Sequence, residues 1–454
     1  MLPTASSRPA CTDDRVIVVG AGLAGLAAAL ELAEQGVPVL VLEKGDVGGE
    51  QSNFAMGWVR TTGRPLAEIP LSLLNRRRFD ALTSNTVRDT WGVLFSAGDA
   101  AHDARLEQWA LGAAQYGVKT RKLGAAQTAA RLPGCSAPLV GGLLTNVDTS
   151  ADPRQLMQMI AARAAACGVE IRTRCAVRAL DMTAGAVRGV VTEQGIERAA
   201  AVVLATGAWT RLMLQGARHT LPSVKVRSAL ARVRVAAPAS SGGAQFARCA
   251  AIADVGYRAL LDGTFVVGLA DRNRVEVTPD AVRFAPRYLP LWWSHRGEIA
   301  PTLGRRFIDE CRHMRAPGAH RVSVYERERA LRPQPDAALA ARAAQRFAAL
   351  FPGLGSVEVI DSWAGYLDMT SDGLPVISAL ARTPGLFVSA GLCGSGLGTA
   401  LGAGRLIASL VTGSAPEIDV APFRIERLTR PSRAAPSRAG VPHGCGGHIG
   451  NGPQ

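Results

Sequence analysis

The feature that most constrains the fold is a glycine-rich turn near the start of the chain, between a short apolar run and a segment of small residues. The turn lies in VIVVGAGLAGLAAAL, where Gly20, Gly22 and Gly25 have the spacing GxGxxG. The residue types predict a strand, a helix and a second strand, over 15–19, 24–35 and 37–42. This β-α-β unit is typical of the opening of a doubly wound domain with a parallel sheet.

The same unit predicts a site for a dinucleotide. Backbone N–H groups at the amino end of a helix can bind a pyrophosphate, and glycine lets the ligand approach them closely. Glu43 follows the second strand, eighteen residues after Gly25, where its carboxylate can accept hydrogen bonds from ribose hydroxyls. A carboxylate there repels a 2′-phosphate, which disfavours NADP. The alternative is a tight turn followed by a surface glutamate.

Two further glycine-rich segments fit the same ligand. GDVGGEQS, at 45–52, could wrap the middle of a long cofactor and offer Ser52 to it, although a surface loop would read alike. GLCGSGLGTALGAGRL, at 391–406, lies between a predicted strand at 386–389 and a predicted helix at 399–411. Its positive helix end could point at the same ligand, and a helix-packing motif is the alternative.

The composition of the chain argues against several classes of function and of site. A chain of 454 residues is expected to form two or three domains. The formal charge of +14 comes almost entirely from arginines scattered among alanines and glycines, with only four lysines, so we predict no nucleic-acid partner. The eight cysteines include no CxxC pair, which argues against a disulfide framework or a zinc site. HGCGGH, at 443–448, lies in a Gly/Pro/Ser-rich stretch, and we predict no metal site there.

The apolar run at 16–30 could suggest a signal peptide, but its glycine spacing opposes that interpretation. The run is also shorter than the roughly 20 residues that cross a bilayer, and no transmembrane segment is predicted. We therefore expect a cytoplasmic protein, either free or peripheral to the inner face of the membrane.

Five segments together resemble the D-amino-acid oxidase and dehydrogenase family. They are VIVVGAGLAGLAAALELAEQGVPVLVLEK, GGEQSNFAMGWVR, VVLATGAW, WAGYLDMTSDGLPVIS and GLFVSAGLCGSGLGTALGAGRL. Within that family the chain looks most like bacterial FAD-dependent D-amino-acid and D-hydroxyproline dehydrogenases. The resemblance implies noncovalent FAD, a two-domain fold, and hydride transfer from the substrate carbon to flavin N5.

The implied fold class is α/β with an α+β substrate domain. A Rossmann-like FAD-binding domain with a central parallel sheet is expected over residues 15–60, 147–217 and 355–415. A discontinuous antiparallel-sheet substrate domain is expected over 61–146 and 218–354. Residues 61–146 read as helices and loops, and predicted strands at 169–180, 188–191 and 201–205 could complete the first sheet. The tails at 1–14 and 430–454 are predicted to be disordered.

The resemblance also assigns cofactor residues. The predicted FAD-binding residues are Gly20, Ala21, Gly22, Leu23, Ala24, Gly25, Glu43, Lys44, Gly49, Glu50, Gln51, Ser52, Val177, Thr206, Gly207, Trp209, Gly394, Ser395, Gly396, Leu397, Gly398 and Thr399. Of these, Val177 matches the strand whose backbone meets the adenine.

Several positions depart from the family pattern. Ser395 stands where relatives often have histidine, Ser371 stands where they have proline, and NFAMGW differs from the expected Ser-Arg-Asn-Trp. The matched motifs contain no histidine, which hydride transfer from a deprotonated amine tolerates. Cys393 does not match the family position for covalent attachment.

An amino-acid substrate needs a cation for its carboxylate, preferably an arginine. Arg258 is the first candidate, with Tyr257 beside it, and Arg332 is another, although its proline-flanked context suggests a turn. Tyr366 and Ser395 complete the predicted catalytic set, and Trp58 is expected to form a wall of the pocket. Each has a structural alternative, such as a surface ion pair or a core aromatic ring.

The predicted function is FAD-dependent oxidation of the C–N bond of a D-amino acid, a cyclic imino acid such as D-hydroxyproline, or a related amine, giving an imine that hydrolyses. Alternatives are a sarcosine/glycine-oxidase-like amine oxidase and a flavin-holding subunit of a hetero-oligomeric dehydrogenase. A pyridine-nucleotide-linked reductase would need a second GxGxxG unit, and the sequence has none. The electron acceptor (oxygen, quinone or carrier protein) and the oligomeric state (homo- or hetero-oligomer) stay open.

Overall fold

The computed structural model describes residues 14–83, 88–89, 92–236, 246–270, 273–294, 299–315 and 321–429. The segment HGCGGH and nearly all of the two predicted disordered tails lie outside these residues. Among the residues that the structure describes, no group of three or more His, Cys, Asp or Glu side chains is arranged to bind a metal ion. No helix in this part combines the length and the apolar character needed to cross a membrane.

A six-stranded sheet forms the first layer. Its order is β21-β22-β13-β1-β2-β9, with β21 antiparallel at one edge and the other strands parallel. The strands are β1 (Val16–Val19), β2 (Val39–Leu42), β9 (Glu170–Arg172), β13 (Ala201–Leu204), β21 (Val376–Ala379) and β22 (Leu386–Ala390). The predicted β-α-β unit and the parallel sheet are therefore present.

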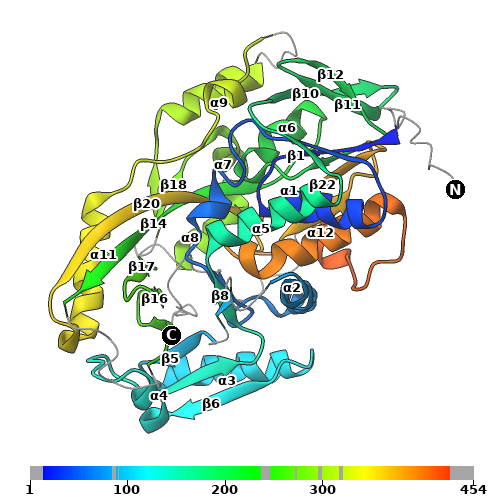
Figure 1. Ribbon diagram of the computed structural model, residues 1–454. Coiled ribbons are helices and arrows are strands. Elements are labelled where there is room, and N and C mark those ends of the chain that lie inside the picture. The colour runs from blue at the N-terminus through cyan, green and yellow to red at the C-terminus, as the bar shows by residue number, and fades with distance from the viewer. Residues whose placement is uncertain are drawn as a thin grey trace, which may run out of the picture.

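Both faces of this sheet are covered, because alternate residues of each strand point to opposite sides. Val16 and Val18 pack into one apolar cluster, and Ile17 and Val19 into another. The helices on the first face are α1 (Leu23–Glu34), α2 (Ile69–Leu82), α5 (Pro153–Ala166) and α12 (Gly396–Thr412). Figure 1 shows α1, α5 and α12 side by side. Gly404 permits the close crossing of α1 and α12, since a Cβ atom there would lie 2.5 Å from the Ala27 carbonyl carbon.

The second face carries a small antiparallel sheet and a short helix. The sheet consists of β10 (Val177–Thr183), β11 (Ala186–Thr192) and β12 (Gly195–Arg198), and the helix is α6 (Thr210–Gly216). The prediction that 169–180 and 188–191 join the central sheet is therefore only partly right. β9 joins it, whereas β10 and β11 pair antiparallel with each other and cover it.

A ten-stranded, mainly antiparallel sheet forms the other half of the molecule. Its path is β19-β18-β14-β17-β16-β15-β5-β7-β6, and β20 also pairs with β14. The strands are β5 (Leu94–Ala97), β6 (Thr120–Gly124), β7 (Gly141–Thr145), β14 (Ser223–Val235), β15 (Cys249–Ile252), β16 (Val255–Ala259), β17 (Phe265–Leu269), β18 (Asn273–Glu276), β19 (Ile299–Thr302) and β20 (Val357–Thr370). A fourth sheet has the order β3 (Trp58–Val59), β8 (Thr149–Ala151) and β4 (Arg88–Asp89).

Helices pack on and around the large sheet. α11 (Ala337–Leu350) buries Ala340, Ala344 and Phe347 against the cluster that contains Tyr257 and Phe265. The other helices of this half are α3 (Ala100–Ala114), α4 (Ala125–Arg131), α7 (Pro279–Arg283), α8 (Ala285–Ser294) and α9 (Arg305–Arg315). The short helix α10 (Val324–Arg327) packs on the second face of the central sheet, where Val324 and Tyr325 join the cluster of Ile17 and Val19. A short helix, α13 (Glu426–Thr429), ends the described chain.

Two segments differ from the predicted domain division. Residues 357–370 were expected in the FAD-binding domain, but β20 pairs with β14 from Val357 to Thr370 and belongs to the large sheet. Within 61–146, the expected helices and loops also include β5, β6 and β7 of that sheet. In the same range α2 packs against α12, where Asn75 Nδ2 donates to the Leu397 carbonyl oxygen at 3.0 Å.

Candidate active site

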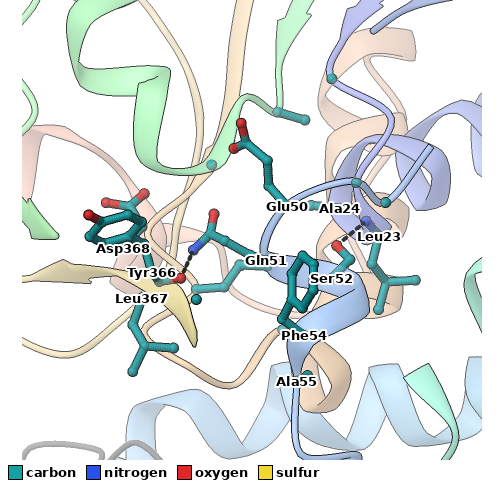
Figure 2. A pocket seen from close by; sticks show the side chains of 18 of the residues that line it. Leu23, Ala24, Glu50, Gln51, Ser52, Phe54, Ala55, Tyr366, Leu367 and Asp368 are labelled. Atoms are coloured by element: carbon teal, nitrogen blue, oxygen red, sulfur yellow. Dashed lines mark hydrogen bonds between the residues drawn. The ribbon is translucent and has the colours of Figure 1, made fainter. Parts of the chain in front are cut away.

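A large cleft lies where the carboxyl ends of the central strands meet the large sheet. It is lined by Val19, Leu42, Ala205 and Ala390 from those strand ends, and by residues of β14 and β20. It encloses about 1840 Å³ outside the protein atoms, including space open to solvent. Figure 2 shows Leu23 and Ser52 on one side and Tyr366 to Asp368 across from them.

The GxGxxG turn is packed so tightly that glycine is required. Gly20 has φ +105°, and a Cβ atom on Gly25 would lie 1.9 Å from the Gly20 carbonyl oxygen. The helix α1 begins directly after Gly22, which has no side chain to cap the helix. Ser52 Oγ instead accepts the Leu23 N–H at 2.9 Å. The positive end of α1 thus faces the cleft over a glycine surface.

Glu43 ends β2 and lines the cleft. Its Oε2 accepts the Ala21 N–H at 2.8 Å and its Oε1 accepts the Gly45 N–H at 2.7 Å. Burial raises the pKa of Glu43, and the two backbone donors oppose that rise. Each carboxylate oxygen accepts several hydrogen bonds, so the backbone contacts orient the group and leave it able to accept more.

The loop after Glu43 is fixed by its own side chains. Glu50 Oε1 accepts from Lys44 Nζ at 2.5 Å and from Trp209 Nε1 at 3.1 Å. Gln51 Nε2 donates to the Tyr366 carbonyl oxygen at 2.8 Å, as Figure 2 shows. This loop therefore connects the central sheet to β20 across the cleft.

The turn before α12 supplies another wall. Gly394, Ser395, Gly396, Leu397 and Gly398 line the cleft where α12 begins. A Cβ atom on Gly398 would lie 2.7 Å from the Arg60 carbonyl oxygen, which explains why glycine stands there. The amino end of α12 therefore opens on the same cleft as that of α1.

The side chains of Cys393 and Ser395 both form hydrogen bonds within the protein. The Cys393 thiol donates to the Gly391 carbonyl oxygen at 3.0 Å, and burial raises its pKa to about 12. Ser395 Oγ lies 3.1 Å from Glu68 Oε1 and 3.1 Å from the Leu392 carbonyl oxygen, and its one hydroxyl proton is shared between these two acceptors.

The structure brings most predicted residues into one cleft. Those that line it are Gly20, Gly22, Leu23, Ala24, Glu43, Lys44, Gly49, Glu50, Gln51, Ser52, Val177, Thr206, Gly207, Trp209, Tyr366, Gly394, Ser395, Gly396, Leu397 and Gly398, and Trp58 also lines it. Three predicted cofactor residues lie just behind the wall. Ala21 N–H binds Glu43, Gly25 packs on Gly20, and Thr399 Oγ1 donates to the Ser395 carbonyl oxygen at 2.9 Å.

Two predicted substrate residues lie outside the lining. Tyr257 is fully buried among phenylalanines on the far side of the large sheet, where its hydroxyl donates to the Ala247 carbonyl oxygen at 2.8 Å. Arg258 is 8% exposed and donates from Nη1 to the Ala151 carbonyl oxygen at 3.1 Å. Its guanidinium packs against Gly57, so Gly57 separates it from the cleft. Residue alternation along β16 explains why the neighbours face opposite sides.

Tyr366 and Arg332 also have structural partners. The Tyr366 ring lines the cleft, and its hydroxyl donates to Glu276. Arg332 Nε donates to the Gly49 carbonyl oxygen at 3.0 Å, and its guanidinium lies over the Phe54 ring. Arg332 thus supports the loop from outside the lining, as its turn-like context suggested.

Arg60 is a lining residue that the sequence analysis missed. Among the described lining residues, the cationic side chains are Lys44 and Arg60. The Arg60 guanidinium lies 6.0 Å from the Trp58 ring centre and 5.7 Å from the Phe95 ring centre. Trp58 was expected in the pocket, and the two-residue period of an extended chain places Arg60 on the same side. That spacing was the available signal.

The wall near Arg60 is apolar and firmly held. Met56, Trp58 and Leu230 belong to one buried cluster, and Trp363 packs against it. The indole N–H of Trp58 donates to the Tyr257 carbonyl oxygen at 3.2 Å, and that of Trp363 donates to the Phe54 carbonyl oxygen at 3.0 Å. With these donors engaged, the two rings present apolar surface to the cleft.

Asp368 is an acidic group in the cleft wall that was not predicted. Its Oδ2 accepts the Gly391 N–H at 3.0 Å, which joins β20 to the turn before α12. Burial raises the pKa of Asp368 to about 6, against the lowering effects of Ser223, Gly391 and the nearby cations Lys225 and Arg211. No sequence signal marked it, because its burial depends on the pairing of β20 with β14.

Comparisons with known proteins agree with this geometry. The family DAO, described as FAD dependent oxidoreductase, matches residues 15–410. The chain is 30% identical over 292 residues to a D-amino acid dehydrogenase of Rhizobium johnstonii, covering 64% of this chain and 55% of that protein. The chain thus spans little more than half the length of that relative. It is 26% identical to a D-amino acid dehydrogenase of a Methylobacterium species, covering 92% and 99% of the two chains.

Among solved structures, the chain is similar to an L-amino acid deaminase from Proteus myxofaciens in complex with anthranilate. The TM-score is 0.84 and the sequence identity is 25%. The alignment covers 95% of this chain and 97% of the other.

Proposed function

Because the chain belongs to the family of FAD-dependent oxidoreductases, we propose that it oxidises the C–N bond of an amino acid. The observation that carries the proposal is one continuous cleft. It runs from Glu43 and the GxGxxG turn, past the amino end of α12, to an apolar region that contains Arg60. The names of the curated relatives favour a D-amino acid as the first substrate to test.

The cleft residues fit FAD. Glycines at Gly20, Gly22 and Gly25 leave bare backbone at the amino end of α1, as a pyrophosphate requires. Glu43 is held in place by two backbone donors and can accept from ribose hydroxyls. Gly394 and its neighbours would lie along the isoalloxazine ring. The Cys393 thiol is already hydrogen-bonded, which supports noncovalent binding.

We assign the substrate carboxylate to Arg60 rather than to Arg258. An arginine can bind a carboxylate through two parallel hydrogen bonds. Arg60 lines the cleft beside an apolar wall, whereas Gly57 lies between Arg258 and the cleft. The aromatic rings near Arg60 lower the local dielectric constant, which strengthens attraction between a guanidinium and a carboxylate.

The chain would promote the reaction by orientation and electrostatics. FAD, when bound, would supply the hydride acceptor for the substrate carbon. Loss of hydride from the neutral amine would give an iminium ion, which water hydrolyses to a 2-oxo acid and ammonium. The positive end of α12 favours negative charge beside it, and Trp58 and Trp363 exclude water. The described lining contains no histidine, so we propose that the substrate amine loses its proton to solvent before oxidation.

The electron acceptor that reoxidises the enzyme is a separate choice. Oxygen, a quinone and a carrier protein are all compatible with the proposed reaction. Once the substrate is exhausted, the conditions under which the absorbance of oxidised flavin recovers would distinguish these acceptors. Recovery in air alone identifies an oxidase, whereas recovery that needs an added quinone or carrier identifies a dehydrogenase.

The test is an anaerobic titration of the FAD-loaded protein with a panel of D- and L-amino acids, glycine, sarcosine and hydroxyproline isomers. Loss of the absorbance of oxidised flavin, with formation of a 2-oxo acid, is expected for at least one amino acid. A protein that binds FAD but is reduced by no compound of the panel would overturn the proposal and favour a flavin-holding subunit. Both enantiomers are needed, because the relatives and the structural neighbour carry names of opposite stereochemistry.

A further inference from the structure

A fully buried ion pair lies directly behind the wall of the cleft. Arg64 Nε lies 2.7 Å from Glu68 Oε1, and Arg64 Nη2 lies 2.7 Å from Glu68 Oε2. Both side chains are 0% exposed. This is a forked, two-bond arrangement on the turn that precedes α2. Neither residue lines the cleft.

The pair is bonded to the turn that does line the cleft. Arg64 Nη1 donates to the Cys393 carbonyl oxygen at 3.2 Å. Glu68 Oε1 accepts from Ser395 Oγ at 3.1 Å. Cys393 and Ser395 both line the cleft, and Ser395 is the cap residue of α12. The cation and the anion thus each hold one residue of the same short turn.

That turn has an unfavourable backbone conformation. Cys393 has φ +50°, which is uncommon for a residue other than glycine, and Gly391 and Gly394 have φ +63° and +73°. A conformation of this kind persists when surrounding contacts impose it. The Arg64 hydrogen bond to the Cys393 carbonyl is one such contact.

Stability alone gives a weak reason for this ion pair. Removing two charges from water has a large free-energy cost, and replacing a buried pair by apolar residues is often neutral or stabilising. Leu71, Leu74 and Phe79 on the nearby α2 show that this region buries apolar side chains well. An ion pair here therefore suggests a role in the cleft.

We propose that Arg64 and Glu68 are positioning residues that fix the turn at 391–396 and set the electrostatic potential where α12 meets the flavin. This inference rests on the proposed function, because that function places the turn along the isoalloxazine ring. The pair would hold two opposite charges behind the turn that faces the ring, so their electrostatic effects on the ring would largely cancel while the geometry of the turn is held. Removing only the anion would leave the guanidinium, which stays charged at any ordinary pH.

The first variant is Glu68→Gln, compared with Glu31→Gln as a matched control. Glu31 is also buried and paired with arginines, Arg78 and Arg405, but it lies near the opposite end of α1. The expected result is a more positive flavin midpoint potential in Glu68→Gln, measured by spectroelectrochemical titration, and an unchanged potential in Glu31→Gln. If the pair had a purely structural role, there would be no reason for the midpoint potential to become more positive rather than more negative. Equal potentials in the two variants would overturn the proposal.

The second variant, Arg64→Met with Glu68→Leu, removes both charges. We expect this protein to fold with a melting temperature near that of the ligand-free wild type, and to bind FAD about tenfold more weakly because the turn is no longer anchored. Wild-type FAD affinity would overturn the proposal. Failure of the double variant to fold would assign the pair to stability and would overturn it as well.

These measurements separate this inference from the proposed function. Midpoint potential and FAD affinity are measured without any amino acid. A wild-type protein that binds FAD and oxidises nothing in the substrate panel refutes the proposed function but leaves this test in force. A wild-type protein that binds no FAD refutes both.

Discussion

The carboxylate of Glu43 accepts the backbone N–H of Ala21 at 2.8 Å, so the end of β2 is tied directly to the glycine turn after β1. The contact holds the acidic group at the cleft before any ligand arrives. A preformed acceptor of this kind loses little conformational freedom when a ribose binds.

Replacing Glu43 by glutamine is expected to weaken FAD binding by about 10- to 100-fold, since a hydrogen bond to a charged group contributes about 1.5–3 kcal/mol. The dissociation constant can be measured by quenching of FAD fluorescence. Glu358→Gln is the control, because Glu358 is exposed on β20 and paired only with exposed Arg234 among the contacts described. Similar affinities for the two variants would remove Glu43 from the cofactor site.

Replacing Gly25 by alanine is expected to destabilise the protein by about 3 kcal/mol or more and to abolish FAD retention. The added Cβ atom would lie 1.9 Å from a backbone oxygen, which cannot rotate away. Gly216→Ala is a control with open space around its Cβ atom, and it should change stability by less than about 1 kcal/mol. Thermal unfolding of both variants checks the prediction, and a Gly25→Ala protein with wild-type melting and FAD content would contradict it.

Exchange of Arg60 for glutamine is expected to raise KM for the amino acid about 10- to 100-fold, with little change in FAD affinity, because a charge-assisted contact to the carboxylate is lost. Arg258→Gln should instead lower the melting temperature, since Arg258 holds the Ala151 carbonyl oxygen. Steady-state kinetics and thermal unfolding of both variants decide between the two arginines. The assignment reverses if only Arg258→Gln raises KM.

The pKa of Asp368 predicts a pH-dependent stability. Burial raises this pKa to about 6, above the ordinary aspartate value, so the folded protein keeps the proton to a higher pH than the unfolded chain does. The contribution of Asp368 to the free energy of unfolding should therefore fall as the pH rises from about 4 to about 6. Asp368→Asn lacks this titration, and its stability relative to wild type should increase by about 1–3 kcal/mol across that range.

Urea unfolding of the ligand-free proteins at several pH values measures this difference. Asp361→Asn is the matched control, because Asp361 is exposed on the same strand. A stability difference between Asp368→Asn and wild type that is the same at pH 4 and pH 7 would show that folding does not raise the pKa of Asp368.

The sequence predicted the central sheet because its signals are local. The strand at Val16, the turn at Gly20 and the acidic residue at Glu43 occur within thirty residues and follow one known geometry. The FAD family followed from widely spaced motifs that the structure brings to one cleft. The individual roles of the predicted cofactor residues stay predictions until variants are measured.

The large sheet was harder to predict because its pairings are distant. β5 pairs with β15, more than 150 residues later, and its four residues carry little periodicity of their own. Arg258, the first candidate for binding the substrate carboxylate, does not line the cleft, and the reason is related. Whether an arginine on a strand meets a cavity depends on what covers it, and here Gly57 does. Arg64 and Glu68 were not singled out in the sequence, because a pair of opposite charges four residues apart is common on exposed helices.

The order in which the strands of the two large sheets occur along the chain limits how the substrate specificity of this protein can change. β1 and β2 belong to the central sheet, β5 to β7 to the other, β9 and β13 to the first again, and β14 to β20 to the second before β21 and β22 return. A substrate half cannot be exchanged as one contiguous segment. New specificities in such a chain must arise through point substitutions and loop insertions around a retained scaffold, and a hybrid joined at a single crossover would inherit mismatched halves of both sheets.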